Sequence, residues 1–335
     1  SGIANSDIVK SYLGLLCLGK NDFDAIENFR GNAFFMRALG LQAVPSSPTL
    51  RQRLDTHAGD WFELAARINQ ALLGSRIEGR AIDFGALPCG YTPVDLDTFA
   101  MHNSDTQKEL VGRTYAGVDG YCPLAVYLGR LGYCLELALR PGVQHSACES
   151  EYNLERTLPL AASLVSGPLL VRADAGFCSL KLMREICAQG AACGREMALI
   201  IKWNPRKTPV ETVAAGKVAD AGTAWQTLRP GKRECVWQEG LDLVDVGNPA
   251  NPARRVYRLT ERTSTATPCC CLNTCWRAGR RRCPGGSARP RSLRCTPTMP
   301  RMSSFTPSSS PTWIWSACPA ASLPPIIWSA GSLWS

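Results

Sequence analysis

Three aspartates lie where acidic side chains could act together on a phosphate. Asp95 and Asp97 are two residues apart in the segment VDLDT, so in a strand both would point to the same face. Asp174 directly follows an apolar run typical of a buried strand. Carboxylates brought together at strand ends repel one another unless a divalent cation neutralises them, and Mg²⁺ takes one or two carboxylates while leaving positions for water and phosphate. The spacing is consistent with a metal site, and surface or capping aspartates are the alternative.

The segments around these aspartates predict an α/β layer. Apolar runs and turn signals predict the following elements: strands at 92–101, 122–129 and 133–140, a helix at 146–165, a strand at 168–174, a helix at 180–189 and a strand at 197–203. This order suits a mixed sheet whose active groups gather at strand ends.

The region before the sheet, residues 6–75, predicts helices. A third helix is expected after Ser47, whose hydroxyl is predicted to cap it and which precedes a proline at the first helical position. A fourth helix follows over 61–72. The third helix carries Arg51 and Arg53. A short basic helix after a tight turn can read DNA, but two arginines are equally what a solvated helix face carries.

Residues 204–262 are poor in helical period and predict a β-rich subdomain. Cations gather in this segment at Arg206, Lys207, Arg229, Lys232, Arg233, Arg254, Arg255, Arg258 and Arg262. Such a cluster could bind phosphates, and an ordinary solvated subdomain is the alternative.

Composition changes abruptly near residue 265. The first 264 residues contain 29 Lys+Arg and 28 Asp+Glu, whereas residues 265–335 contain eight Arg and no Lys, Asp or Glu. We therefore expect residues 265–335 to form an aberrant, disordered tail. A zinc module is the alternative, but its cysteines include three in a row with no nearby His, which fits zinc-ligand spacing poorly. The cysteines in question are Cys269, Cys270, Cys271, Cys275 and Cys283.

The sequence predicts a cytoplasmic protein without a membrane span. The apolar stretch at 320–334 is broken by two prolines, and the cysteines of residues 1–264 lack a disulfide-framework spacing. The chain begins at Ser1 with helix signals already at residues 5–7, so we expect an N-terminal piece to be missing.

Seven segments resemble those of the DDE transposases of bacterial insertion sequences, specifically the insertion-sequence family thirteen-eighty. They are SDIVKSY (6–12), VPSSPTLRQR (44–53), VDLDT (94–98), GYCPL (120–124), LRPG (139–142), VRADAGF (171–177) and IKWNPR (201–206). The resemblance covers nearly all of residues 1–262. It implies an RNase H-like fold, an α/β mixed sheet flanked by helices. The domains expected are a helical N-terminal region (1–78), a catalytic core (79–203) and a β-rich insertion (204–264).

The resemblance also implies site residues and metal ions. The first catalytic acid of the family falls on Asp97, with Asp95 as the alternative, and the second falls on Asp174. Two Mg²⁺ or Mn²⁺ ions in an intact enzyme would activate water, and then a DNA 3′-hydroxyl, for attack on phosphodiesters. The third acid, a Glu on a helix after the insertion, is missing because no acid follows Glu261.

DNA is the partner that the resemblance implies. The expected ligand is double-stranded DNA at the terminal inverted repeats of the element, with self-association on that DNA and location at the bacterial nucleoid. The residues expected to contact it are Arg51, Arg53, Lys202, Arg206 and Lys207.

The composition of the tail is typical of a coding sequence translated in a shifted reading frame. When residues 269–332 are back-translated and read from the third base of each codon, permitted synonymous codons give helical period, mixed charge and the segment HEQFHSELK. Its Glu and Lys follow the spacing of the family's closing signature. A net loss of one base or gain of two near residues 263–269 explains this, and programmed frameshifting stays open. We therefore expect no transposition by this chain. The alternatives are a DNA-binding remnant that occupies element ends and another RNase H-like metal-dependent nuclease.

Overall fold

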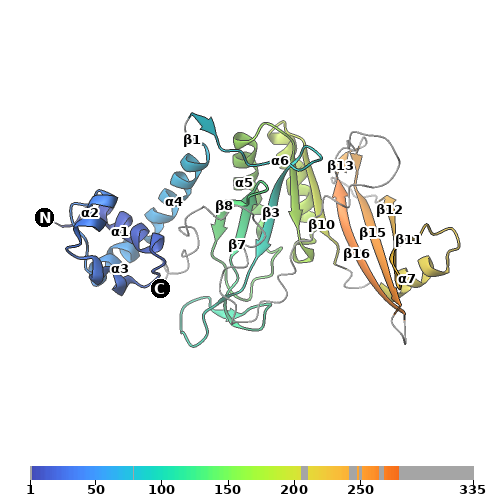
Figure 1. Ribbon diagram of the computed structural model, residues 1–335, viewed down its shortest axis with the longest axis horizontal. Coiled ribbons are helices and arrows are strands. Elements are labelled where there is room, and N and C mark those ends of the chain that lie inside the picture. The colour runs from blue at the N-terminus through green and yellow to red at the C-terminus, as the bar shows by residue number, and fades with distance from the viewer. Residues whose placement is uncertain are drawn as a thin grey trace. The chain divides into compact units, whose positions relative to one another are not determined.

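The structure is a computed structural model that divides into two compact units (Figure 1). One unit holds the described residues up to Ile82, and the other holds those from Asp83 on. The ranges described are 2–77, 79–204, 210–240, 247–248, 251–263 and 268–278.

The first unit is helical, as the sequence predicts. Its elements are α1 (Asn5–Cys17), the 3₁₀ helix η1 (Phe23–Phe29), α2 (Ala33–Leu39), α3 (Ser47–Thr56), α4 (Ala58–Leu73) and the strands β1 (Arg76–Ile77) and β2 (Arg80–Ala81). Ile8, Leu15, Ile26 and Leu50 are fully buried and join these helices into one apolar core. Burial of such side chains contributes roughly 1.5–3 kcal/mol each to stability.

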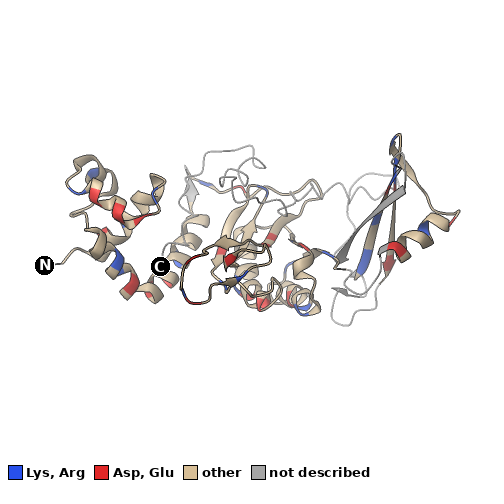
Figure 2. Ribbon diagram, turned by 90° about the horizontal axis from the view of Figure 1, so that it is seen from below, with Lys and Arg blue, Asp and Glu red and all other residues tan. Residues whose placement is uncertain are grey.

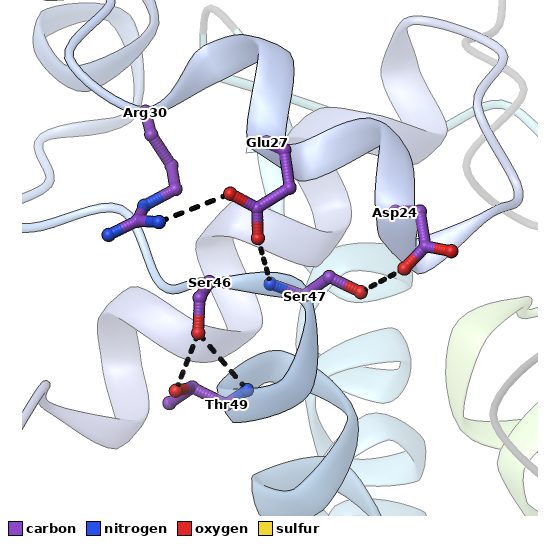
Figure 3. Close-up of polar contacts among 6 residues, drawn as sticks. All are labelled: Asp24, Glu27, Arg30, Ser46, Ser47 and Thr49. Atoms are coloured by element: carbon purple, nitrogen blue, oxygen red, sulfur yellow. Dashed lines mark hydrogen bonds and ion pairs between the residues drawn. The ribbon is translucent and has the colours of Figure 1, made fainter.

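The start of α3 differs by one residue from the predicted cap. Ser46, not Ser47, is the N-cap, and its hydroxyl accepts a hydrogen bond from the Thr49 backbone N–H at 3.4 Å (Figure 3). Ser47 is already helical, because its own polar groups bind the acids of η1. Its backbone N–H donates to Glu27 at 2.7 Å and its hydroxyl donates to Asp24. The prediction of a cap at Ser47 was therefore wrong, although it located the helix.

The second unit is built on a nine-stranded sheet with the order β11-β12-β15-β16-β10-β9-β3-β7-β8. The strands are β3 (Thr92–Thr98), β7 (Leu124–Leu128), β8 (Tyr133–Ala138), β9 (Leu169–Ala173), β10 (Met197–Lys202), β11 (Gln226–Arg229), β12 (Lys232–Gly240), β15 (Arg254–Thr263) and β16 (Pro268–Ala278). β3 pairs antiparallel with β7 and parallel with β9, and β9 pairs parallel with β10. The predicted α/β mixed sheet flanked by helices, with a helical N-terminal region and a β-rich insertion, is confirmed.

The two faces of the sheet's core have different side chains. Val94, Val171 and Leu199 lie side by side on β3, β9 and β10 and are fully or almost fully buried. They are covered by α5 (Ser150–Leu164) and α6 (Leu180–Ala192), which pack against each other and against the sheet. The next residue on each of these strands points to the opposite face of the sheet. We call this the carboxylate face, defined by Asp95, Asp97, Arg172 and Ile200.

A small sheet beside β7 explains two of the sequence motifs. Its strands are β4 (Met101–His102), β5 (Gly112–Arg113) and β6 (Asp119–Tyr121). A Cβ atom at Gly120 would lie 1.9 Å from the Met101 carbonyl oxygen, and one at Gly142 would lie 2.0 Å from the Gly120 carbonyl oxygen. Only glycine allows these backbone segments to approach so closely. The glycine of GYCPL therefore allows β6 to pair closely with β4, and the glycine of LRPG allows the chain that follows β8 to pass against the small sheet.

Two predictions about the second half of the chain need correction. Helix α7 (Val210–Ala219) lies in a segment that was expected to be poor in helix. The sequence did not predict it because its apolar residues are spread around the helix and give no clear period. Strand β16 lies within the tail that was expected to be disordered from residue 265. Strand pairing uses backbone groups, so an unusual composition does not prevent it. The remaining tail, residues 279–335, lies outside the described residues.

β13 (Gly247–Asn248) and β14 (Asn251–Pro252) form a separate pair in the insertion. In the described ranges, no helix combines the length and apolar character needed to cross a bilayer.

Candidate functional site

Asp97 and Asp174 lie at neighbouring strand ends, as the sequence predicts. Leu96 on β3 pairs with Ala173 on β9, and each aspartate is the next residue along its strand direction. Because the two strands are parallel, their carboxyl ends meet at the same edge of the pair. Asp174 then caps the 3₁₀ helix η2 (Ala175–Phe177), and its Oδ1 accepts a hydrogen bond from the Gly176 N–H at 2.9 Å.

The pKa of Asp97 is raised by its surroundings. Burial, and after it the negative charge of Asp174, together raise the pKa of Asp97 to about 7. The Thr98 backbone N–H donates to Asp97 Oδ1 at 2.8 Å and opposes this effect by favouring the charged form. Asp97 therefore exchanges its proton near neutral pH, which is a typical property of a functional carboxylate.

Asp95, the alternative first acid, has a different role in the structure. Its two carboxylate oxygens accept bidentate hydrogen bonds from the Arg172 guanidinium, both at 2.6 Å. Both side chains are largely buried, with 27% of Asp95 and 14% of Arg172 exposed. The charge of Asp95 is thus neutralised within the protein, whereas that of Asp97 faces another carboxylate.

A tyrosine that the sequence analysis did not select lies beside the pair. The Tyr115 hydroxyl donates to the Thr98 carbonyl oxygen at 3.0 Å, although 64% of the residue is exposed. Burial of the hydroxyl raises the pKa of Tyr115 to about 12, and the charge of Asp97 contributes to the increase. Tyr115 lies in the turn between β5 and β6, and no motif in the sequence signals it.

A buried arginine organises the loop behind the site. Arg140 donates to the carbonyl oxygens of His145 at 2.7 Å, Cys148 at 2.8 Å and Ser146 at 3.2 Å. The loop in turn places the Ser146 hydroxyl 2.8 Å from the Thr98 hydroxyl, next to Asp97. The motif LRPG contained the signal for this network, but its arginine has no carboxylate partner that sequence reasoning could have paired with it.

The same loop restricts the space around Asp174. A Cβ atom at Gly176 would lie 3.0 Å from Asp174 Oδ1 and 3.0 Å from the Ser146 hydroxyl oxygen. Contacts of that length are tighter than normal packing, so a larger residue would displace one of the two side chains. The glycine of VRADAGF therefore keeps Asp174 in its observed position.

The donor set of the site suits a hard divalent cation. It consists of two carboxylates, one of them desolvated and repelled by the other, and a cation would offset both effects. Within the described part of the chain, no group of three His, Cys, Asp or Glu side chains is arranged to hold a metal. The two aspartates could thus supply two ligands of a metal site.

The residues expected to contact DNA differ in how accessible they are. Arg51 is exposed on α3 with its guanidinium 5.3 Å from the centre of the Phe23 ring. Arg53 on the same helix donates to the Asn5 side chain, so part of its hydrogen-bonding capacity is used within the unit. Lys202 is exposed at the end of β10. Arg206 and Lys207 lie outside the described residues.

Comparison with known proteins gives a family and one similar structure. Residues 4–194 match the family described as Transposase DDE domain group 1. A cryo-EM structure of a piggyBac transposase synaptic complex with hairpin DNA is similar, with a TM-score of 0.37 and 12% identity. The match covers 86% of this chain and 54% of that chain, so this chain spans about half the length of the structure it matches. No curated protein matches.

Proposed function

Since the chain belongs to the family Transposase DDE domain group 1, we propose that Asp97 and Asp174 are two of the three catalytic acids of a DNA transposase. The observation that carries the proposal is their position at adjacent ends of parallel strands, with the pKa of Asp97 raised by burial and by Asp174. The finer assignment is to the insertion-sequence family thirteen-eighty, which the seven sequence segments support. The substrate is double-stranded DNA at the ends of the element.

Asp97 and Asp174 would hold Mg²⁺ or Mn²⁺, which when bound supplies charge neutralisation at the oxygens of the phosphodiester. The chain's own residues prepare this site. Asp97 must lose its proton to act as a ligand, so the cation would compete with that proton and bind more tightly as pH rises through about 7. The Thr98 N–H orients Asp97, and the Gly176 N–H orients Asp174. Arg140 holds the loop whose Ser146 lies against Thr98 and Gly176, the residues whose N–H groups bind the two aspartates.

The third acid belongs, on this proposal, to the shifted reading frame of the tail. This chain would then bind DNA without completing transposition, because one metal ligand is absent. The nucleotide sequence across codons 255–335 tests this part. A shifted frame that runs open through HEQFHSELK supports it, and a frame closed by stop codons contradicts it.

Catalysis is tested in a frame-repaired chain with DNA that carries the element's ends. Asp174→Ala should abolish Mg²⁺-dependent cleavage, whereas Glu155→Gln, an exposed acid on α5, should cleave like the parent chain. Normal cleavage by Asp174→Ala would overturn the assignment. Cleavage by the parent chain without joining to target DNA would identify a nuclease instead of a transposase.

A further inference from the structure

The cations of the β-rich insertion are sorted by strand register into two groups with different surroundings. In the pairing of β12 with β15, Lys232 lies opposite Arg262 and Val236 lies opposite Arg258, while Gly240 lies opposite Arg254. Alternate residues of a strand point to the same face, so these cations share one face. We call Lys232, Arg254, Arg258 and Arg262 the basic row. Figure 2 colours the Lys and Arg of these strands blue.

The opposite face of β12 and β15 packs against α7 and has balanced charge. Cys235 and Leu259 on the strands form a small core with Ala214 of α7. Arg233 pairs with Glu261 on this face. Arg255 stacks over Trp203, with its guanidinium carbon 4.4 Å from the ring centre. Charges on this face therefore serve the internal structure of the insertion.

Three of the four cations of the basic row have no side-chain partner among the described residues. In the part of the chain that the structure describes, Lys232, Arg258 and Arg262 form no hydrogen bond or ion pair with another side chain. The acidic residues of β12 and β15 are Glu234, Glu239 and Glu261, and register places only Glu234 on the face of the basic row. Four cations against one acid give this face a net positive charge, whereas the opposite face is balanced.

Register also relates the basic row to the candidate active site. Val256, which is on the face of the basic row, pairs with Cys275 of β16, and Cys275 pairs with Lys202 of β10. Two residues along β15, Arg254 pairs with position 277 of β16, which pairs with Ile200 of β10. Ile200 in turn pairs with Arg172 of β9. The basic row and Lys202 are therefore on the carboxylate face of the sheet.

The charge of the core itself does not favour a polyanion. On the carboxylate face, Arg172 is neutralised by Asp95, and Asp97 and Asp174 are negative when ionised. DNA that approaches these carboxylates must be held by cations elsewhere. The three arginines of the basic row are four residues apart, so at about 3.3 Å per residue they span roughly 26 Å, the length of about eight base-pair steps.

We infer that the basic row, continued by Lys202, is a binding surface for the phosphates of duplex DNA whose scissile region lies at Asp97 and Asp174. The inference rests on the proposed function, since it assigns the surface that holds that site's substrate. It excludes Arg233 and Arg255 from DNA contact, although sequence alone placed them in the same basic cluster.

The test compares two variants that remove the same charge from opposite faces. Arg258→Gln/Arg262→Gln alters the basic row, and Arg233→Gln/Arg255→Gln alters the α7 face. Binding of the full chain to a labelled duplex of about 30 base pairs is measured by anisotropy from about 50 to 200 mM KCl. EDTA is present, so the result does not depend on cleavage, and failure of the catalytic proposal would leave it unchanged.

The basic-row variant should reduce the slope of log K against log salt by about 1.8 and weaken binding up to roughly 30-fold at 0.15 M salt, because about 0.9 counterions are released per phosphate contact. The α7-face variant should keep the slope and lose thermal stability. Equal slopes for both variants, a lower slope for the α7-face variant only, or no binding of duplex by the parent chain would overturn the inference. The single variant Arg262→Gln, at an exposed position, should reduce the slope by about 0.9. It keeps the test valid if the double variant does not fold.

Discussion

Replacement of Asp97 by Asn should stabilise the protein at alkaline pH. Burial, and then the charge of Asp174, raise the pKa of Asp97 from 3.8 to about 7. The folded state therefore binds more protons than the unfolded state between these values, and stability falls as pH rises from about 4 to about 7. A shift of about three units corresponds to roughly 4 kcal/mol, the cost of ionising Asp97 in the folded protein. Since Asn is buried but uncharged, we expect Asp97→Asn to gain about 2–4 kcal/mol at pH 8 and almost nothing at pH 4.

The measurement is the free energy of unfolding in urea, across this pH range and with EDTA present. Asp95→Asn is the matched control, because the same change is made two residues away on the same strand face. It should destabilise the protein by about 1–3 kcal/mol at pH 8, because it leaves the Arg172 guanidinium without its counter-charge. The reasoning is refuted if Asp97→Asn destabilises the protein at pH 8, or if its effect is the same at pH 4 and pH 8.

Three further substitutions test the supporting structure. Arg140→Met removes the donor to three backbone carbonyls and should cost about 3 kcal/mol or more in urea unfolding, and a cost below about 1 kcal/mol would show that the loop does not depend on it. Gly176→Ala places a Cβ 3.0 Å from Asp174 Oδ1 and should weaken Mn²⁺ binding about tenfold in a calorimetric titration; unchanged binding would contradict this. Tyr115→Phe removes one hydrogen bond to Thr98 and should cost about 1 kcal/mol in urea unfolding, and no loss would mean that solvent replaces the bond.

The sequence located the two aspartates because both follow apolar runs, and the ends of buried strands are readable from such runs. It could not distinguish Asp95 from Asp97 by physical reasoning alone, since both lie on one strand face. The distinction depends on Arg172, 77 residues beyond Asp95 along the chain, which the parallel pairing of β3 with β9 brings opposite Asp95. Pairing between distant strands is a tertiary property that local patterns do not contain.

In the insertion, too, the sequence could not predict which side chains share a face. The cations of residues 204–262 formed one cluster in the sequence, and only the register of β12 with β15 separates Arg258 from Arg255. Helix α7 was missed because its apolar residues do not follow one side of the helix. Tyr115 was missed because it reaches Thr98 from a turn of the small sheet, and its position depends on how that sheet packs.

Titration of Mn²⁺ into the full chain at about pH 8, where Asp97 is ionised, measures whether Asp97 and Asp174 bind a divalent cation. We expect Asp97→Asn and Asp174→Asn each to weaken binding by about tenfold or more, whereas Asp95→Asn, folded under the same conditions, should bind Mn²⁺ like the parent chain. Binding that is unchanged in Asp97→Asn and Asp174→Asn would contradict the claim that these two carboxylates form the metal site of a transposase.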